Sequence, residues 1–184
     1  LTVSNNTNLV NLYAGKNNLS SLNLNNNNKL INLGIENNNI NNIDELALGK
    51  KVNLKYLNIE NNEFTSINLE NNTNLTWLVV RGNKLDELNV SFLKDLNILA
   101  IGGNNLKEIN VTHNTKLTNF FMENDGSTDD ITDDITDIDL SNNNQIEKIH
   151  INNSKLETLN LKNISKLSQT MLNEILNKNE NLKK

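Results

Sequence analysis

The sequence contains no Cys and no Pro, and aromatic residues make up only 4% of it. Without Cys, the chain has no disulfides, no thiolate metal ligands and no Cys nucleophile. Acidic residues are in excess, with a net charge of −5 and a pI of about 5.1, so we expect no basic surface for nucleic acid. No apolar run approaches the roughly 20 residues that a bilayer-spanning helix needs, so we expect no transmembrane segment.

Asn is the abundant residue and accounts for about a quarter of the chain. It forms helices and strands poorly but tolerates tight turns, so the chain must turn often. An Asn or Asp recurs in steps of 21, 24, 21, 21 and 21 residues. The aligned positions are Asn17, Asn38, Asn62, Asn83, Asn104 and Asp125. This regular spacing indicates an internal repeat.

Each repeat unit holds two copies of an L-x-x-L-x-L phrase, and an Asn follows each copy three residues later. The L-x-L part alternates as a strand with one buried face does. Coils stacked about 4.8 Å apart would bury these faces in one continuous core. A buried Asn would then bond backbone groups of neighbouring coils. Seven full units begin at Leu9, Leu30, Leu54, Leu75, Leu96, Leu117 and Ile146. We therefore predict a β-rich solenoid.

The spacing resembles the leucine-rich-repeat superfamily, and above all its short bacterial type with the unit LxxLxLxxNxLxxLxLxxNxx. The third unit shows the match, with the residues Leu54, Leu57, Ile59, Asn62, Phe64, Ile67, Leu69 and Asn72. The resemblance covers roughly residues 1–166. It implies a right-handed coil with a concave parallel β-sheet and a second extended segment on the other side. It also implies binding rather than chemistry, although a fold alone does not fix function.

The two ends of the chain depart from the full unit. The first residues match the second half of a unit, so we expect a fragment of a longer protein or a missing amino-terminal cap. After Ile164 the pattern stops, and Ser168 is a suitable cap for a short helix. The apolar residues of that helix fall on one face at Met171, Leu172, Ile175 and Leu176. We predict a solenoid over 1–166 and a helical cap over 167–184; the alternative is the start of another domain.

The outward positions of the aligned units differ between the two phrases. In the first phrase, Tyr56, Trp77 and Ile98 should lie side by side on adjacent strands, beside Val79 and Phe121. The matching column of the second phrase is uniformly polar, with Asn23, Asn68, Asn89, Asn110, Asp139 and Asn160. Exposed apolar clusters rimmed by charge often mark interaction sites. The predicted partner-binding residues on the concave face are Tyr13, Tyr56, Trp77, Val79, Ile98, Phe121, Glu60, Arg81 and Glu123. Alternatively, these side chains stabilise the sheet or pack against another part of the protein.

Two units contain insertions, which solenoids place as loops on one face. The second unit gains three residues near 43–46, and the sixth gains eight within 126–134. The segment 125–137 is rich in Asp, at Asp125, Asp129, Asp130, Asp133, Asp134 and Asp137. Clustered oxygen ligands suit Ca²⁺, but this spacing fits neither an EF-hand nor a β-roll repeat. We expect a solvated acidic loop.

Residues that carry chemistry are scarce in this sequence. His113 and His150 fall in different units, and neither has the spacing of a metal site or a catalytic partner. The segment Gly102-Gly103-Asn104 recurs like Arg81-Gly82-Asn83, so it belongs to the repeat turn and not to a phosphate loop. We expect no catalytic residues, no bound metal and no cofactor.

Together these observations predict a non-catalytic, monomeric protein-binding module of a secreted or surface-attached bacterial protein. The expected partner is a protein, with a glycan as the alternative. Two other functions stay open from the sequence. One is a structural spacer, and the other is the substrate-recognition part of a larger multidomain protein.

Overall fold

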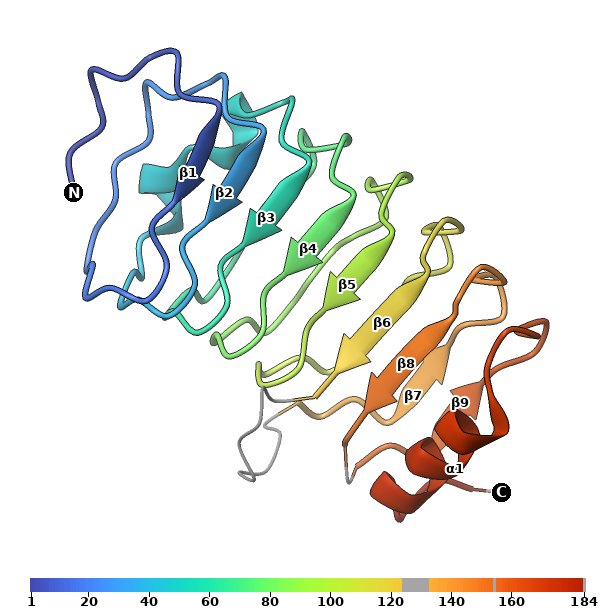
Figure 1. Ribbon diagram of the computed structural model, residues 1–184. Coiled ribbons are helices and arrows are strands. Elements are labelled where there is room, and N and C mark those ends of the chain that lie inside the picture. The colour runs from blue at the N-terminus through green and yellow to red at the C-terminus, as the bar shows by residue number, and fades with distance from the viewer. Residues whose placement is uncertain (124–132, 154, 184) are drawn as a thin grey trace.

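The computed structural model describes residues 1–123, 133–153 and 155–183. The chain winds as a solenoid, and seven of its described strands form a parallel sheet in the order β1-β2-β3-β4-β5-β6-β8 (Figure 1). These strands are β1 (Asn11–Tyr13), β2 (Asn32–Gly34), β3 (Tyr56–Asn58), β4 (Trp77–Val79), β5 (Ile98–Ala100), β6 (Asn119–Met122) and β8 (Lys148–Ile151). The other elements are η1 (Ile43–Leu46), η2 (Leu48–Lys50), β7 (Asp137–Asp139), β9 (Thr158–Asn160) and α1 (Gln169–Lys178).

The strand register pairs equivalent positions of successive repeats. Leu33 lies opposite Leu57, Leu57 opposite Leu78, and Leu78 opposite Leu99. All four side chains are fully buried, because every strand turns the same face of its L-x-L phrase inward. The predicted parallel solenoid with a stacked leucine core is therefore confirmed.

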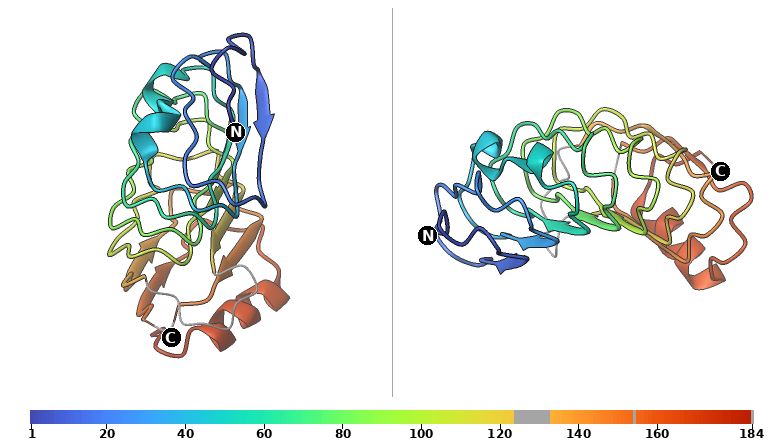
Figure 2. Two further views of the ribbon diagram at one scale, coloured as in Figure 1. Left: turned by 90° about the vertical axis from the view of Figure 1, so that its left-hand side faces the viewer. Right: turned by 90° about the horizontal axis from the view of Figure 1, so that it is seen from above.

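The solenoid is gently curved, and the seven-stranded sheet lines the inner side of the curve (Figure 2, right). The second segment of each coil runs along the outer side, as the sequence predicts. Within the described residues this segment forms regular strands only in the last two coils, where β7 pairs with β9. On the outer side of the second coil, the three-residue insertion folds into the short 3-10 helices η1 and η2.

Buried Asn side chains join the coils beside the strands. We call the aligned Asn17, Asn38, Asn62, Asn83 and Asn104 the strand-side ladder; Asn17 in the first coil is exposed and donates to Ala14 O and Gly15 O of its own coil, whereas the other four are buried. Asn83 is typical: its Nδ2 donates to the carbonyls of Ile59 in the preceding coil and Val80 in its own coil, both at 3.0 Å. Its Oδ1 accepts the Phe64 N–H at 3.1 Å. Each of the four buried side chains thus satisfies backbone groups that the turn leaves without strand partners.

The sixth position of the strand-side ladder corrects the sequence alignment. Asp133 occupies it, not Asp125, which lies outside the described residues together with Asp129 and Asp130. The Asp133 carboxylate accepts the N–H groups of Asn104 at 3.2 Å and Leu106 at 3.0 Å. The sequence led us to expect Asp133 in a solvated acidic loop. It is instead fully buried, so that expectation is wrong for this residue. Burial raises the pKa of Asp133, while the backbone hydrogen bonds oppose this rise.

A second row of buried Asn residues follows the outer turns, at Asn27, Asn72, Asn114 and Asn143. Lys51 stands in the equivalent position between Asn27 and Asn72 and is fully buried. Its Nζ donates to Leu24 O at 3.0 Å and Ala47 O at 3.3 Å. Ala47 belongs to the inserted 3-10 turns, so the longer side chain reaches a carbonyl that the other coils lack. Burial lowers the pKa of the Lys51 ammonium to about 8.

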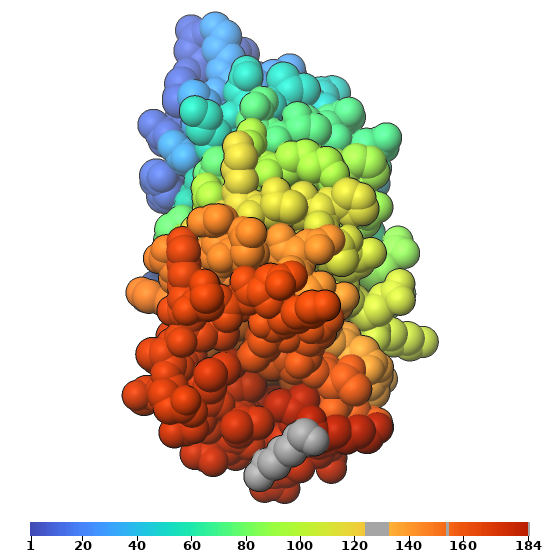
Figure 3. Space-filling view, turned by 90° about the vertical axis from the view of Figure 1, so that its right-hand side faces the viewer, coloured from blue at the N-terminus to red at the C-terminus, as the bar shows by residue number. Residues whose placement is uncertain are grey.

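The helix α1 lies along β8 at the carboxyl end of the sheet, and Figure 3 looks onto this end of the molecule. Ser168 caps it as predicted, since its Oγ accepts the Met171 N–H at 3.2 Å. Asn179 follows the helix, donates to Ile151 O at 3.0 Å and accepts the Asn153 N–H at 3.0 Å. These bonds continue the pattern of the strand-side ladder beyond the last strand, so α1 and Asn179 cover the edge of the sheet.

Candidate functional site

The register brings the predicted apolar residues together on the inner face of the sheet. Trp77 lies between Tyr56 and Ile98 on adjacent strands. One column further along, Val79 lies opposite Ala100, and Ala100 lies opposite Phe121. Both columns belong to the strands that line the inner side of the curve (Figures 1 and 2). Trp77 is the only Trp in the chain, and 40% of it is exposed.

Three aromatic rings form a row at the amino-terminal half of this face. The ring centroids of Tyr13 and Tyr56 are 6.1 Å apart, and those of Tyr56 and Trp77 are 5.7 Å apart. Tyr13 reaches across β2 because Gly34 has no side chain there. A Cβ at Gly34 would lie only 2.9 Å from Tyr13 Cδ1. We call Tyr13, Tyr56 and Trp77 the aromatic row. The neighbouring rings pack against one another, while much of Tyr13 and Trp77 stays exposed.

The sequence predicts that Val79 contributes exposed surface to this face, but its side chain is buried. It is 8% exposed, and Ala100 beside it is 2% exposed. Both side chains are short, and larger residues such as Trp77, Arg81 and Phe121 occupy the neighbouring positions. Val79 and Ala100 therefore form the floor between the aromatic row and Phe121. The partly exposed apolar residues of this face are Tyr13, Tyr56, Trp77, Ile98 and Phe121.

The three predicted charged residues lie together in a chain of ion pairs. Arg81 Nη1 is 3.9 Å from Glu60 Oε1, and Arg81 Nη2 is 3.9 Å from Glu123 Oε1. The guanidinium also lies over the Phe121 ring, with its central carbon 5.4 Å from the centroid. Gly102 is the outward residue between Arg81 and Glu123, and a Cβ there would lie 2.4 Å from the Glu123 carbonyl oxygen. The glycine thus permits close contact of these two coils.

Sequence reasoning missed two contributors to this face. Lys178 at the end of α1 extends the chain of ion pairs, with its Nζ 3.9 Å from Glu123 Oε2. His150 stacks beside Phe121 with a centroid distance of 5.5 Å. The column alignment already placed His150 next to Phe121, so this contact had a signal in the sequence. The contact with Lys178 had no signal in the sequence, because a helix after the repeats has no defined register with them.

The pKa of Tyr56 on this face departs from its ordinary value. Burial raises its pKa, and the negative potentials of Glu36, Tyr13 and Glu60 act in the same direction. A hydrogen bond with the Asn58 side chain opposes these effects. Tyr56 therefore stays neutral at physiological pH and presents a hydrogen-bonding hydroxyl beside two apolar rings.

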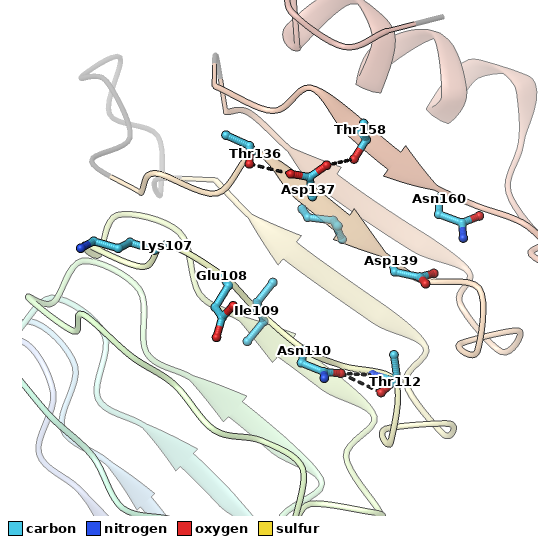
Figure 4. Close-up of a pocket in the computed structure, with 11 residues that line it drawn as sticks. Lys107, Glu108, Ile109, Asn110, Thr112, Thr136, Asp137, Asp139, Thr158 and Asn160 are labelled. Carbon is cyan, nitrogen blue, oxygen red and sulfur yellow. Dashed lines mark hydrogen bonds between the residues drawn. The ribbon is translucent and has the colours of Figure 1, made fainter.

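The outer side offers a different kind of hollow, of about 500 Å³, between residues 107–112 and β7 (Figure 4). Polar groups that line it bond to one another. Thr136 Oγ1 donates to Asp137 at 2.6 Å, and Thr158 Oγ1 donates to the same carboxylate. These hydrogen bonds lower the pKa of Asp137, which therefore does not act as a proton donor near neutral pH.

The column of polar residues that the sequence places on the outer side stabilises the backbone. In every coil where it occurs, its Asn or Asp accepts the N–H two residues later, as Asn89 does from Ser91 at 3.0 Å. The six acceptors are Asn23, Asn68, Asn89, Asn110, Asp139 and Asn160. This is an Asx turn, in which a short side chain closes the bend of the backbone. The sequence predicts a polar column but not this local role.

The ranges 1–123, 133–153 and 155–183 contain no group of three or more His, Cys, Asp or Glu residues placed to hold a metal ion. Of the acidic segment, the described Asp134 pairs with Lys155. In the same ranges, no helix has the length and apolar character needed to cross a membrane. The positive φ of Gly82 and Gly103, at 58° and 73°, confirms that these glycines belong to the repeat turn.

Solved structures of bacterial leucine-rich-repeat proteins share this fold. The functional domain of InlJ from Listeria monocytogenes, which includes a cysteine ladder, is 30% identical with a TM-score of 0.73. The match covers 91% of this chain and 40% of that one. The internalin InlF from Listeria monocytogenes is 22% identical with a TM-score of 0.69, covering 98% and 55%. A leucine-rich-repeat protein of Leptospira interrogans is 17% identical with a TM-score of 0.68, covering 96% and 48%.

These comparisons agree with the repeat and the architecture. The chain has the leucine-rich-repeat fold of these bacterial proteins, and its parallel solenoid is consistent with their 21-residue repeat type. It spans about half the length of these solved chains or less. No protein-family model and no curated protein sequence matches it significantly. Whereas the InlJ domain includes a cysteine ladder, this chain has no Cys, and its coils are joined by buried Asn side chains.

Proposed function

We propose that the chain is a non-catalytic protein-binding module and that the inner face of its sheet is the binding surface. The proposal rests on one observation. The only Trp of the chain is 40% exposed at the centre of this face, within a row of aromatic side chains on adjacent strands. Aromatic residues in a preformed, rigid surface are frequent anchors of protein interfaces because they bury much area at little entropic cost.

The charged residues of the inner face support this function. Arg81 is held by Glu60, Glu123 and the Phe121 ring, so its orientation is fixed before any partner arrives. A preorganised charge beside an apolar surface favours a specific orientation of the partner. The likeness to internalin structures agrees with a repeat module for protein interaction in a secreted or surface-attached bacterial protein. A monomer with a solenoid over 1–166 and a helical cap over 167–184 completes the proposal.

Sheet stabilisation is the competing role of the aromatic row. Cross-strand aromatic pairs contribute roughly 0.2–1 kcal/mol each to a sheet, and Tyr56 contacts rings on both sides. That role predicts a loss of stability after Trp77→Ala but no loss of binding. A glycan is the other candidate ligand, since aromatic rings also stack on sugars.

The test is affinity capture from extracts of candidate partner cells, followed by titration of the captured protein. Wild type is compared with Trp77→Ala/Phe121→Ala and with Phe92→Ala, which removes an exposed ring at a residue lining an outer-side groove. Circular dichroism first verifies that the double variant is folded. The proposal then predicts that the double variant loses the partner and that Phe92→Ala retains it. Equal capture by all three proteins would refute the inner face as the working surface.

A further inference from the structure

A carboxylate and an aromatic ring share a hollow at the amino-terminal end of the inner face. Gly15 and Gly34 are outward residues of the first two coils. Because they have no side chains, neighbouring side chains can occupy the space above them. A Cβ at Gly15 would lie 2.3 Å from Glu36 Oε1, and a Cβ at Gly34 would lie 3.2 Å from Glu36 Oε2. The Tyr13 ring fills the other part of the space over Gly34. Glu36 is therefore held beside the aromatic row.

Two cations of the inner face, Arg81 and Lys178, are engaged elsewhere. Arg81 pairs with Glu60 and Glu123, and Lys178 pairs with Glu123. Of the ion pairs between described residues, none includes Glu36, although it is only partly exposed. This end of the face therefore carries an unneutralised negative charge next to three aromatic rings.

The negative potential reaches the aromatic row. Glu36 and Glu60 both act on the Tyr56 hydroxyl and favour its protonated form. Tyr13, 66% exposed, lies on one side of Tyr56, and Trp77 lies on the other. A carboxylate beside electron-rich rings is a favourable environment for an organic cation. A negatively charged partner group would instead meet repulsion here.

We propose that Tyr13, Glu36 and Tyr56 receive a lysine or arginine side chain of the protein partner, adjacent to an apolar partner side chain that packs on Trp77. This inference rests on the proposed function of the inner face and adds the chemistry of the partner. The aromatic rings contact the aliphatic stem of the basic residue and its charged head, while Glu36 supplies the counter-charge. The partner segment is thus basic and apolar in alternation, and acidic segments are rejected.

The test uses a pool of displayed twelve-residue peptides with randomised sequence, selected on immobilised protein. Four proteins are compared: wild type, Glu36→Gln, Trp77→Ala and Glu87→Gln. Glu87 is exposed at the outer side, so Glu87→Gln matches the change in net charge. Retained peptides are sequenced, and the best one is titrated against each protein with and without its basic residue. Thermal unfolding verifies that the near-isosteric Glu36→Gln variant keeps its fold.

The inference predicts that wild type and Glu87→Gln enrich peptides with Lys or Arg beside an apolar residue. Glu36→Gln should lose that enrichment and bind the selected peptide about tenfold more weakly, as for a partly desolvated charge contact. Peptides that depend on Trp77 but show no basic preference, or a preference that Glu36→Gln leaves intact, would overturn the inference and leave the proposed function standing. Retention that Trp77→Ala leaves unchanged would overturn both.

Discussion

Removal of one side chain from the strand-side ladder tests how the coils are held together. Asn83 is buried, and its Nδ2 donates to carbonyls of two coils while its Oδ1 accepts the Phe64 N–H. Asn83→Ala leaves that N–H buried without a partner, which costs about 1–3 kcal/mol. The loss of two further hydrogen bonds, at about 1 kcal/mol each, brings the expected loss in the free energy of unfolding to about 3–5 kcal/mol.

The assay is urea unfolding followed by circular dichroism and by the fluorescence of the single Trp. Asn89→Ala is the matched control, because Asn89 is exposed and water easily replaces the bond that its side chain accepts from the Ser91 N–H. The control should lose less than about 1 kcal/mol. A loss below about 1 kcal/mol for Asn83→Ala would refute the claim that the buried Asn side chains hold the coils together.

Three further changes probe packing and burial. Leu78→Ala truncates a fully buried core residue and should lower the free energy of unfolding by roughly 2–5 kcal/mol in the same urea assay; a neutral result would contradict the strand register. Gly102→Ala should lower the melting temperature, because its Cβ would lie 2.4 Å from the Glu123 carbonyl oxygen, whereas Gly49→Ala, with its nearest atom at 3.5 Å, should not. Lys51 has a folded pKa of about 8, below its ordinary 10.5, so the unfolded chain binds more protons between these values and stability should rise with pH there. Urea unfolding at pH 7.5 and 10 should show this rise in wild type and not in Lys51→Met; equal pH dependence would refute the burial of the ammonium.

Most of the fold could be predicted from the repeat period. Because one face of each L-x-L phrase must be buried, a shift of one residue would expose the whole set, so the pattern determines the register. This is why the sequence alone predicts that Tyr56, Trp77 and Ile98 lie side by side, as the strand register shows. The cap at Ser168 was predictable for a similar reason, since it depends only on local hydrogen bonds.

Insertions and long-range contacts lay beyond the sequence. The repeat pattern shows that eight residues are added in the sixth unit but not where within them the register resumes. An Asp was available at both 125 and 133, and the structure shows that Asp133 takes the ladder position. Burial of Lys51 was missed because it depends on the carbonyl of Ala47 in the inserted turns. Exposure of Val79 was overestimated because it depends on the size of its neighbours, not on the direction of its side chain.

The most direct test of the inner face is the affinity of the captured partner for Trp77→Ala, measured by titration calorimetry beside wild type and Phe92→Ala. The account predicts a loss of about 2 kcal/mol, or roughly thirtyfold in Kd, for Trp77→Ala. Phe92→Ala should bind as wild type does, and the three proteins should have similar unfolding curves. An unchanged Kd for a folded Trp77→Ala protein would contradict the account, as would a loss of affinity that only Phe92→Ala shows.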